Sequence, residues 1–341
     1  HSYEHTVQFV QISVSARIFY AESIDKLIKN MNECKPQIMT AVPRFYQNLY
    51  QKINNNFNKS KGLKKYLINK MLFLGKKKIN KEDLDLFEIF VNYLLDKTIR
   101  KKIKSQFGGS LKTFVSGGGA LDKEVGFFLN AIGLPTLQGY GLTESSPVVS
   151  CNPINDIRVE TVGPPFKGNK VKIAQDGEIL VKGENVMLGY WNNKEETNKV
   201  IIDGWLHTGD IGVFENNYLK ITDRKKDILI TPGGDNISPL KIENELINSE
   251  LFEQAIVYGD NKPYLVCLLV LSETFNQQVD NNQIKAEIEL VNTKLINIEK
   301  IKKYIVVKEK FSIENGMLTP TLKLKRYKII NKFKKEFENL Y

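Results

Sequence analysis

Cysteine is scarce in this sequence, with only Cys34, Cys151 and Cys267 among 341 residues. Three widely separated cysteines exclude a disulfide scaffold and a CxxC metal site, and they suit a reducing cytosol. A long apolar run is also lacking, because the longest, residues 264–271, is far shorter than the roughly 20 residues of a membrane-spanning helix. Internal repeats and low-complexity tracts are absent as well. These absences leave a globular chain, for which we expect a cytoplasmic location.

The chain carries a formal net charge of +10, which raises the question of a nucleic-acid partner. Arginine and aromatic residues do not interleave in a basic stripe, and the sequence has no helix-turn-helix, zinc-finger or RNA-binding sheet signature. Lysine, asparagine and isoleucine are frequent throughout, so a compositional bias accounts for the charge. We therefore expect no nucleic-acid partner. Hydrophobic residues at 42% and charged residues at 26% are typical of a folded protein, and the length suits two or three domains.

Residues 59–81 hold nine lysines and no acidic residue, interleaved with apolar side chains. A basic amphipathic helix of this kind can rest on an anionic membrane face. A solvated lysine face on an ordinary surface helix is the alternative, and it is the commoner arrangement. The pattern predicts a helix in both cases, and residues 82–106 are expected to continue as helix.

Beyond residue 109 the sequence alternates short strands, glycine turns and helices, which is typical of an α/β layer. One helix is predicted to open with residues 117–125 and to end at Gly133. A second is predicted from Leu240, with Ser238 as its cap. Strands are predicted at 111–116, 134–141, 254–259, 264–272 and 303–308, with a hairpin around Asp176 and Gly177. Residues 218–234 are expected to form a strand pair broken by a charge cluster.

Three glycine-rich loops follow one another: SGGGAL (116–121), QGYGLTES (138–145) and GWLHTGDIG (204–212). Glycine permits backbone conformations closed to other residues and lets a ligand approach the main chain. The first loop matches neither GxGxxG nor GxxxxGK[ST], so a plain tight turn is its alternative.

The second and third loops add polar groups suited to a nucleotide. Tyr140 offers a ring for stacking, Thr143 a hydroxyl for a phosphate oxygen and Glu144 a carboxylate for a hard cation such as magnesium. Asp210, in the third loop, can accept bonds from two ribose hydroxyls.

Taken in order, these loops resemble the adenylate-forming (AMP-binding) superfamily, and within it the long-chain fatty-acid–CoA ligases. Further stretches that carry the resemblance are VGPPFKGNKVKI, GEILVKGENVMLGYW, ITDRKKDILITPGGDNISPLKIE, LTPTLKLKR, HSYEHT and AVPRFYQNLYQKI. The resemblance implies an α/β, multi-domain α+β protein. Residues 1–222 would be the C-terminal portion of the large adenylation domain with its β-hairpins, 223–227 a hinge, and 228–341 a small mobile α/β lid domain.

The resemblance also implies a two-step reaction. A long-chain fatty-acid carboxylate attacks the α-phosphate of ATP and gives an acyl-adenylate and pyrophosphate. The thiol of coenzyme A then attacks the acyl carbon and releases AMP. The expected cofactors are therefore ATP or AMP, Mg²⁺ and coenzyme A. Alignment and charge neutralisation matter more in such chemistry than acid or base groups.

The resemblance assigns roles residue by residue. Those at the nucleotide are Gly117, Gly118, Gly119, Gly139, Tyr140 and Gly141 around the adenine, Thr143 near the AMP phosphate, Asp210 on the ribose, and Arg224 on the ribose or phosphate side. Those with other roles are Glu144 on Mg²⁺, Lys226 as the hinge residue, Gly233 and Gly234 beside the coenzyme A path, and Lys323 reaching the carboxylate and α-phosphate. Thr143, Glu144 and Lys323 form the implied catalytic set. Tyr140 could instead be a ring of the hydrophobic core, and Arg224 could belong to a solvated charge cluster. Lys325 is the alternative to Lys323 as the catalytic lysine.

Two features depart from the family pattern. The SGTTGxPKG type of phosphate loop is nowhere in the sequence, and His5 stands where many relatives carry arginine. We expect the loop upstream of His1, so that the chain is N-terminally truncated. The alternatives are a fatty-acyl-AMP ligase or acyl-carrier-protein synthetase, and an inactive fragment or split-enzyme subunit. Expected partners are the fatty acid, ATP and coenzyme A, with a membrane surface at residues 59–81 and a second copy of the chain as further candidates.

Overall fold

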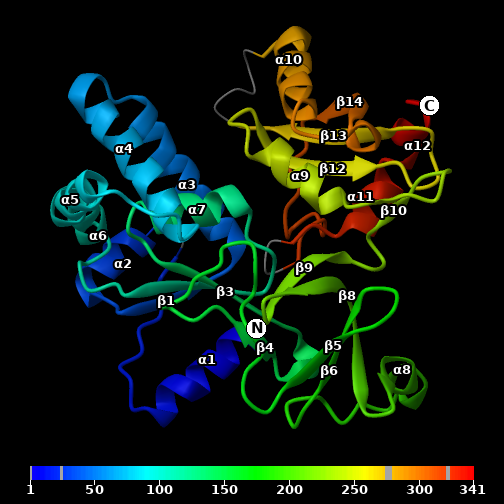
Figure 1. Ribbon diagram of the computed structural model, residues 1–341. Coiled ribbons are helices and arrows are strands. Elements are labelled where there is room, and N and C mark those ends of the chain that lie inside the picture. Colours follow the sequence, from blue (N-terminus) through cyan, green and yellow to red (C-terminus); the bar gives the residue numbers. More distant parts are fainter. Residues whose placement is uncertain (1, 24–25, 273–278, 320–322) are drawn as a thin grey trace. The chain divides into compact units, whose positions relative to one another are not determined.

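The computed structural model describes residues 2–23, 26–272, 279–319 and 323–341. The chain divides into two compact units, His1–Ile221 and Thr222–Tyr341 (Figure 1). Both units mix helices and sheets, so the predicted α/β class is confirmed. Among the described residues, no helix combines the length and the apolar character needed to cross a bilayer.

The first unit contains a four-stranded sheet in the order β1-β2-β3-β4. Its strands are β1 (Ile38–Ala41), β2 (Thr113–Ser116), β3 (Thr136–Gly141) and β4 (Val148–Cys151). The pairs β1–β2 and β2–β3 are parallel, whereas β4 runs antiparallel to β3. The strands predicted at 111–116 and 134–141 are therefore confirmed.

Helices cover this sheet through a shared apolar core. The helices that contribute to this core include α2 (Leu27–Cys34), α3 (Pro43–Asn58), α4 (Gly62–Ile79) and α7 (Lys123–Ala131). Helix α1 (Ser2–Ser13) precedes them and has no buried residue. Tyr46 of α3 and Phe114 of β2 are fully buried, with ring centroids 5.4 Å apart. The predicted helix at 117–133 is confirmed in a shorter form, because the Asp122 carboxylate accepts from two backbone amides and fixes the start at Lys123.

The predicted helix at 82–106 begins later than expected. Asp85 caps it by accepting from the backbone amide of Glu88 at 2.7 Å, which leaves residues 82–85 outside. Three helical pieces then follow without interruption: α5 (Leu86–Leu95), the π-helical turn η1 (Asp96–Arg100) and α6 (Lys101–Ser105). The π-helical turn ends at a buried arginine, Arg100.

A second sheet of the first unit carries the predicted hairpin. Its elements are β5 (Lys170–Ile173), β6 (Glu178–Lys182), α8 (Lys194–Val200), β7 (Ile201–Ile202), β8 (Trp205–Glu215) and β9 (Tyr218–Arg224). β5 and β6 pair antiparallel around Gly177, whose φ of +84° suits glycine, so the hairpin is confirmed. The strand pair expected within residues 218–234 is wrong, because β9 pairs with β8.

The second unit has its own sheet, β12-β13-β14. Its elements are β10 (Leu229–Ile230), β11 (Asn236–Ile237), α9 (Pro239–Ile247), β12 (Phe252–Tyr258), β13 (Leu265–Leu271), α10 (Asn281–Asn292), η3 (Asn297–Glu299), β14 (Ile301–Val307), α11 (Arg326–Lys332) and α12 (Lys334–Glu338). Every residue of β13 is buried. Alternate side chains enter two separate cores, one containing Leu265 and Cys267 and the other Val266 and Leu268. The predicted cap of α9 is confirmed, since Ser238 Oγ accepts from the amide of Lys241 at 3.3 Å.

Candidate active site

The carboxyl ends of β1, β2 and β3 meet at one edge of the first sheet, because the three strands are parallel. The loop SGGGAL follows β2 at this edge, and QGYGLTES begins in β3 and continues beyond it. Ligands of open α/β sheets bind outside the carboxyl ends of their strands. The first two glycine-rich loops therefore lie where a ligand site is expected.

The first loop lies tightly against helix α1. A Cβ on Gly117 would stand 2.7 Å from the ring of Tyr3, and the Gly117 amide donates to the carbonyl of Ala41 at 3.3 Å. Gly118 has a φ of +79°, which other residues rarely adopt, and Gly119 is exposed. The loop therefore presents main chain rather than side chains at the sheet edge. Tyr3, which the sequence analysis assigned no role, lies in the quoted HSYEHT stretch.

The second and third loops are joined by one hydrogen bond. The hydroxyl of Tyr140, which is half-buried in β3, donates to Asp210 Oδ2 of β8 at 2.8 Å. Gly141 follows Tyr140, and a Cβ there would overlap the carbonyl oxygen of Pro147. Gly139 has only ordinary contacts around such a Cβ. The two side chains that the sequence assigned to adenine and ribose therefore lie in contact.

Asp210 is held in place by a buried carboxylate that the sequence analysis missed. Glu178 opens β6 and accepts from the amide of Gly209 at 2.8 Å, while its other oxygen lies 3.1 Å from His207 Nδ1. The Asp210 amide donates to Thr208 Oγ1 at 3.1 Å. The sequence offered one signal for Glu178, because this acidic residue begins the otherwise apolar stretch EILV.

Thr143 and Glu144 lie in the short 3₁₀ helix η2 (Thr143–Ser145). Thr143 is exposed, and its hydroxyl is 3.2 Å from Ser2 Oγ. The hydroxyl of Tyr190 donates to Glu144 Oε1 at 2.8 Å, and the Met187 amide donates to the Glu144 carbonyl at 2.8 Å. Burial and this bond to Glu144 raise the pKa of Tyr190 to about 12. The segment that ends in GYW therefore orients Glu144, a role that the sequence analysis did not assign.

A magnesium ion is compatible with Glu144. The described residues hold no group of three or more His, Cys, Asp or Glu side chains that could bind a metal. Mg²⁺ often uses only one or two protein carboxylates together with substrate phosphates. A carboxylate with one oxygen engaged by Tyr190 keeps further acceptor capacity, so the residues present fit the ion.

The remaining predicted site residues belong to the second unit. Arg224 and Lys226 are exposed at the end of β9 and in the turn after it, and Gly233 and Gly234 are exposed in the turn before β11. Lys323 is also exposed, and its amide donates to Thr319 Oγ1 at 3.0 Å. Residues 320–322 of the LTPTLKLKR stretch and His1 of HSYEHT lie outside the described residues.

Comparison with known proteins agrees with the expected resemblance. The family model described as AMP-binding enzyme matches residues 1–191, and that of the AMP-binding enzyme C-terminal domain matches residues 226–341. Long-chain-fatty-acid–CoA ligase FadD15 of Mycobacterium bovis is 32% identical over 94% of this chain and 57% of its own. Long-chain-fatty-acid–CoA ligase 5 of Rattus norvegicus is 33% identical over 100% of this chain and 54% of its own. The chain thus spans a little over half the length of these relatives.

Solved structures share the fold at lower identity. The adenylation domain of a carboxylate reductase from Mycobacterium chelonae superposes with a TM-score of 0.71 at 22% identity, covering 95% of this chain and 49% of that one. O-succinylbenzoate coenzyme A synthetase from Bacillus subtilis, in complex with AMP, gives 0.67 at 21% identity, covering 96% and 58%. These likenesses support the fold.

Proposed function

The chain belongs to the AMP-binding enzyme family, and on that premise we propose that it acts, as part of a longer enzyme, in the ATP-dependent activation of a long-chain fatty acid. The acid would form an acyl-adenylate with release of pyrophosphate, and coenzyme A would then take the acyl group with release of AMP. The single observation that carries the proposal is the meeting of loops at the sheet edge, where Tyr140 donates to Asp210.

In the first unit, the proposed roles follow from the contacts. The main chain of Gly117–Gly119 and of Gly139–Gly141 would flank the adenine with the Tyr140 ring. Asp210, whose position Glu178 fixes through the Gly209 amide, would accept from the ribose hydroxyls. The exposed hydroxyl of Thr143 would donate to the AMP phosphate.

Magnesium is proposed at Glu144, and Tyr190 would hold that carboxylate in a fixed orientation. When bound, the ion would neutralise phosphate charge. What this chain itself supplies is alignment, because preformed contacts need no rearrangement when the nucleotide arrives.

In the second unit, we propose that Lys323 reaches the fatty-acid carboxylate and the α-phosphate during adenylation. A cation there stabilises charge that develops in the transition state. Arg224 would bind the ribose or phosphate side, and Gly233 and Gly234 would border the path of coenzyme A. Residues 223–227, with Lys226 as the hinge residue, are proposed as the hinge, since hinges are short terminal segments that absorb dihedral changes.

The proposal is tested by supplying the phosphate-loop half as a separate polypeptide and measuring ATP–pyrophosphate exchange. Exchange should depend on added long-chain fatty acid, and coenzyme A should then yield the thioester and AMP. Exchange that is equally fast without the acid would contradict the assignment. Exchange without thioester formation would favour a fatty-acyl-AMP ligase or a carrier-protein synthetase.

Lys323→Ala is expected to abolish adenylation and to spare thioester formation from preformed acyl-adenylate, because the lysine is proposed to act only in the first step. The two half-reactions are measured separately, by pyrophosphate exchange and by thioester release. Lys325→Ala is the matched control and should leave both intact. An equal loss of both half-reactions in the Lys323 variant would rule out the proposed role.

Two partner proposals remain from the sequence. The exposed lysines of residues 59–81 would contact an anionic membrane electrostatically, while Met71 and Leu74 of the same helix face the core. Pairing with a second copy of the chain would be tested by sedimentation.

A further inference from the structure

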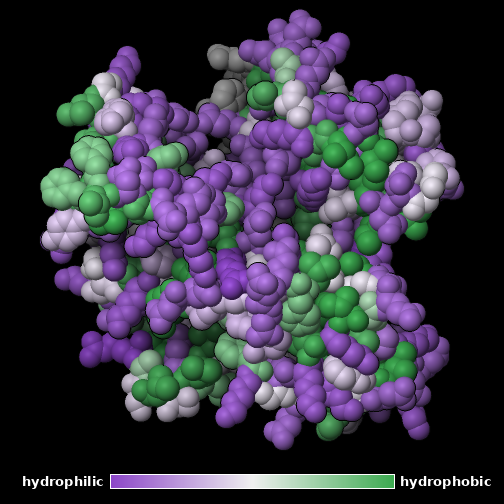
Figure 2. All heavy atoms as spheres, viewed as in Figure 1, coloured by the Kyte–Doolittle hydropathy of each residue, from purple (hydrophilic) through white to green (hydrophobic). Residues whose placement is uncertain are grey.

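Helix α5 presents apolar side chains to solvent, and its buried residues are Glu88, Asn92 and Leu95. Six apolar or aromatic residues form its outer face, with Leu86 87% and Phe87 70% exposed. The members of this outer face are Leu86, Phe87, Ile89, Phe90, Tyr93 and Leu94. Hydrophobic side chains gather over α5 at the left edge of Figure 2. A surface helix of a globular protein normally shows the opposite arrangement.

The inner face of α5 is fixed by polar contacts, so the helix cannot rotate to bury its outer face. Glu88 is buried and pairs with Lys77 of α4 at 2.7 Å. Asn92 is buried too, and its Oδ1 accepts from the guanidinium of Arg100 at 2.8 Å. Rotation would leave these buried partners unpaired, so these contacts fix which face of α5 is exposed in the part of the chain that the structure describes.

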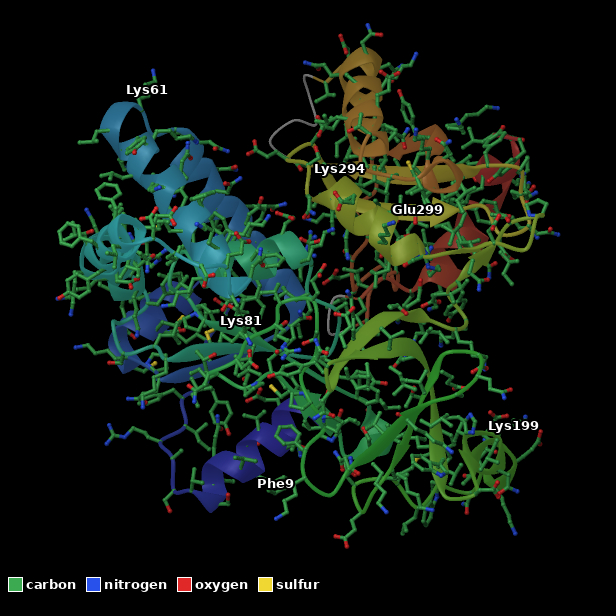
Figure 3. The ribbon with its side chains drawn as sticks, in the orientation of Figure 1. Phe9, Lys61, Lys81, Lys199, Lys294 and Glu299 are labelled. Carbon is green, nitrogen blue, oxygen red and sulfur yellow. The ribbon has the colours of Figure 1, made fainter. Side chains whose placement is uncertain are left out.

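Positive charge lies beyond the carboxyl end of this face, whereas Glu82, Asp83 and Asp85 are exposed just before its amino end. Residues 59–105, which include α4, α5, η1 and α6, contain thirteen lysines and one arginine against five acidic residues, a net +9 in a chain whose total is +10. Lys97, Lys101 and Lys102 are exposed along the helix that continues α5. Lys61 stands at the amino-terminal end of α4 (Figure 3). A single segment thus carries nearly all of the net charge of the chain.

We propose that the outer face of α5 inserts into the interfacial layer of an anionic lipid bilayer while the lysines of α4 and of the helix that continues α5 contact lipid phosphates. Interfacial helices combine Phe and Leu on one face with lysines beside it, and they lie in the plane of the bilayer. A polynucleotide would satisfy the charge but not the six apolar side chains. A second copy of this segment would bring +9 against +9. The inference goes beyond electrostatic contact by residues 59–81, and it does not depend on the proposed reaction.

The test is co-sedimentation of the 341-residue chain with phosphatidylcholine vesicles, with and without phosphatidylglycerol. Binding should require the anionic lipid and weaken as salt is raised. Phe87→Ser combined with Phe90→Ser should weaken binding at least about tenfold, because in the parent chain both rings move from water into the bilayer on binding. Lys97→Gln and Lys101→Gln should each weaken it about fivefold, as expected for one basic residue near an anionic surface.

Matched controls come from helix α10, where Leu290 and Lys285 are exposed. Leu290→Ser and Lys285→Gln should leave vesicle binding unchanged. Vesicle binding by the Phe87/Phe90 variant equal to that of the parent chain would overturn the proposal. A fall in oligomeric size of that variant, with no vesicle binding by the parent, would also overturn it and identify a second copy as the occupant. As an independent measurement, emission from a Tyr93→Trp variant should be quenched by brominated anionic lipid, and an absence of quenching would overturn the insertion.

Discussion

Gly139 and Gly141 lie two positions apart in the second loop and differ in the room around them. A Cβ on Gly141 would overlap the Pro147 carbonyl oxygen, a backbone atom, whereas a Cβ on Gly139 would meet its nearest neighbour at 3.6 Å. Gly141→Ala should therefore lower the free energy of unfolding by about 3 kcal/mol. Gly139→Ala, the matched control, should change it by less than about 1 kcal/mol. Urea unfolding measures both, and equal effects would contradict the steric explanation.

Asp223 gives a pH prediction for the second unit. Burial raises the pKa of this carboxyl, although the Ser238 hydroxyl and the Arg224 amide act in the opposite direction. Between the unfolded value, about 3.9, and the raised folded value, the folded chain binds more protons than the unfolded chain. The free energy of unfolding should consequently fall as pH rises through that window. Asp223→Asn should flatten this dependence in urea titrations, and parallel pH profiles for the two proteins would contradict it.

At the residue scale, the sequence predicted which side chains could bind a nucleotide better than it predicted which side chains contact one another. Tyr140 and Asp210 stood out because each lies in a glycine-rich loop with a recognisable pattern. Tyr190 and Glu178 did not stand out, because they act through hydrogen bonds with Glu144 and Gly209, which are distant along the chain. Only folding reveals which side chains meet across such separations.

Arg100 joins several helices of the first unit and is the basis of a prediction at the element scale. Its guanidinium donates to the carbonyls of Ala131 and Met71 at 2.7 and 2.9 Å, and to the side chains of Asn92 and Asp96 at 2.8 Å each. Lysine cannot reproduce this planar set of donors.

Arg100→Lys should therefore lower the free energy of unfolding by about 3 kcal/mol, since buried acceptors would lose their donors. Thermal or urea unfolding measures the change. Arg17→Lys, at an exposed position, is the control and should change stability by less than about 0.5 kcal/mol. Similar losses in both variants would refute the role of the buried network.

The existence of most elements was predictable, but their pairing and orientation were not. Alternating strands and glycine turns located β2, β3, β12, β13 and β14, and local cap residues located α9. The pairing of β9 was missed because both β8 and β10 are plausible neighbours along the chain. The direction of α5 was equally hidden, since apolar residues occupy both of its sides. The buried contacts of Glu88 with Lys77 and of Asn92 with Arg100 decide which side is buried.

The two units have separate cores, which suggests independent unfolding at the scale of the molecule. Both tryptophans, Trp191 and Trp205, lie in the first unit, and the buried Cys267 lies in the second. In a Cys34→Ser/Cys151→Ser variant, tryptophan emission should report unfolding of the first unit and thiol reactivity that of the second. We expect two different urea midpoints. Coincident midpoints would instead mean one cooperative transition.

The composition of strand β13 predicts how the second unit behaves once it has unfolded. Its seven residues, LVCLLVL, carry no charge, proline or glycine and are all buried between two cores. Such a segment has the composition of sequences that self-associate when exposed. Whenever heat or denaturant opens the second unit, this strand would become available to other chains. Thermal inactivation should therefore be irreversible, and its rate should rise with protein concentration because opened chains associate with one another.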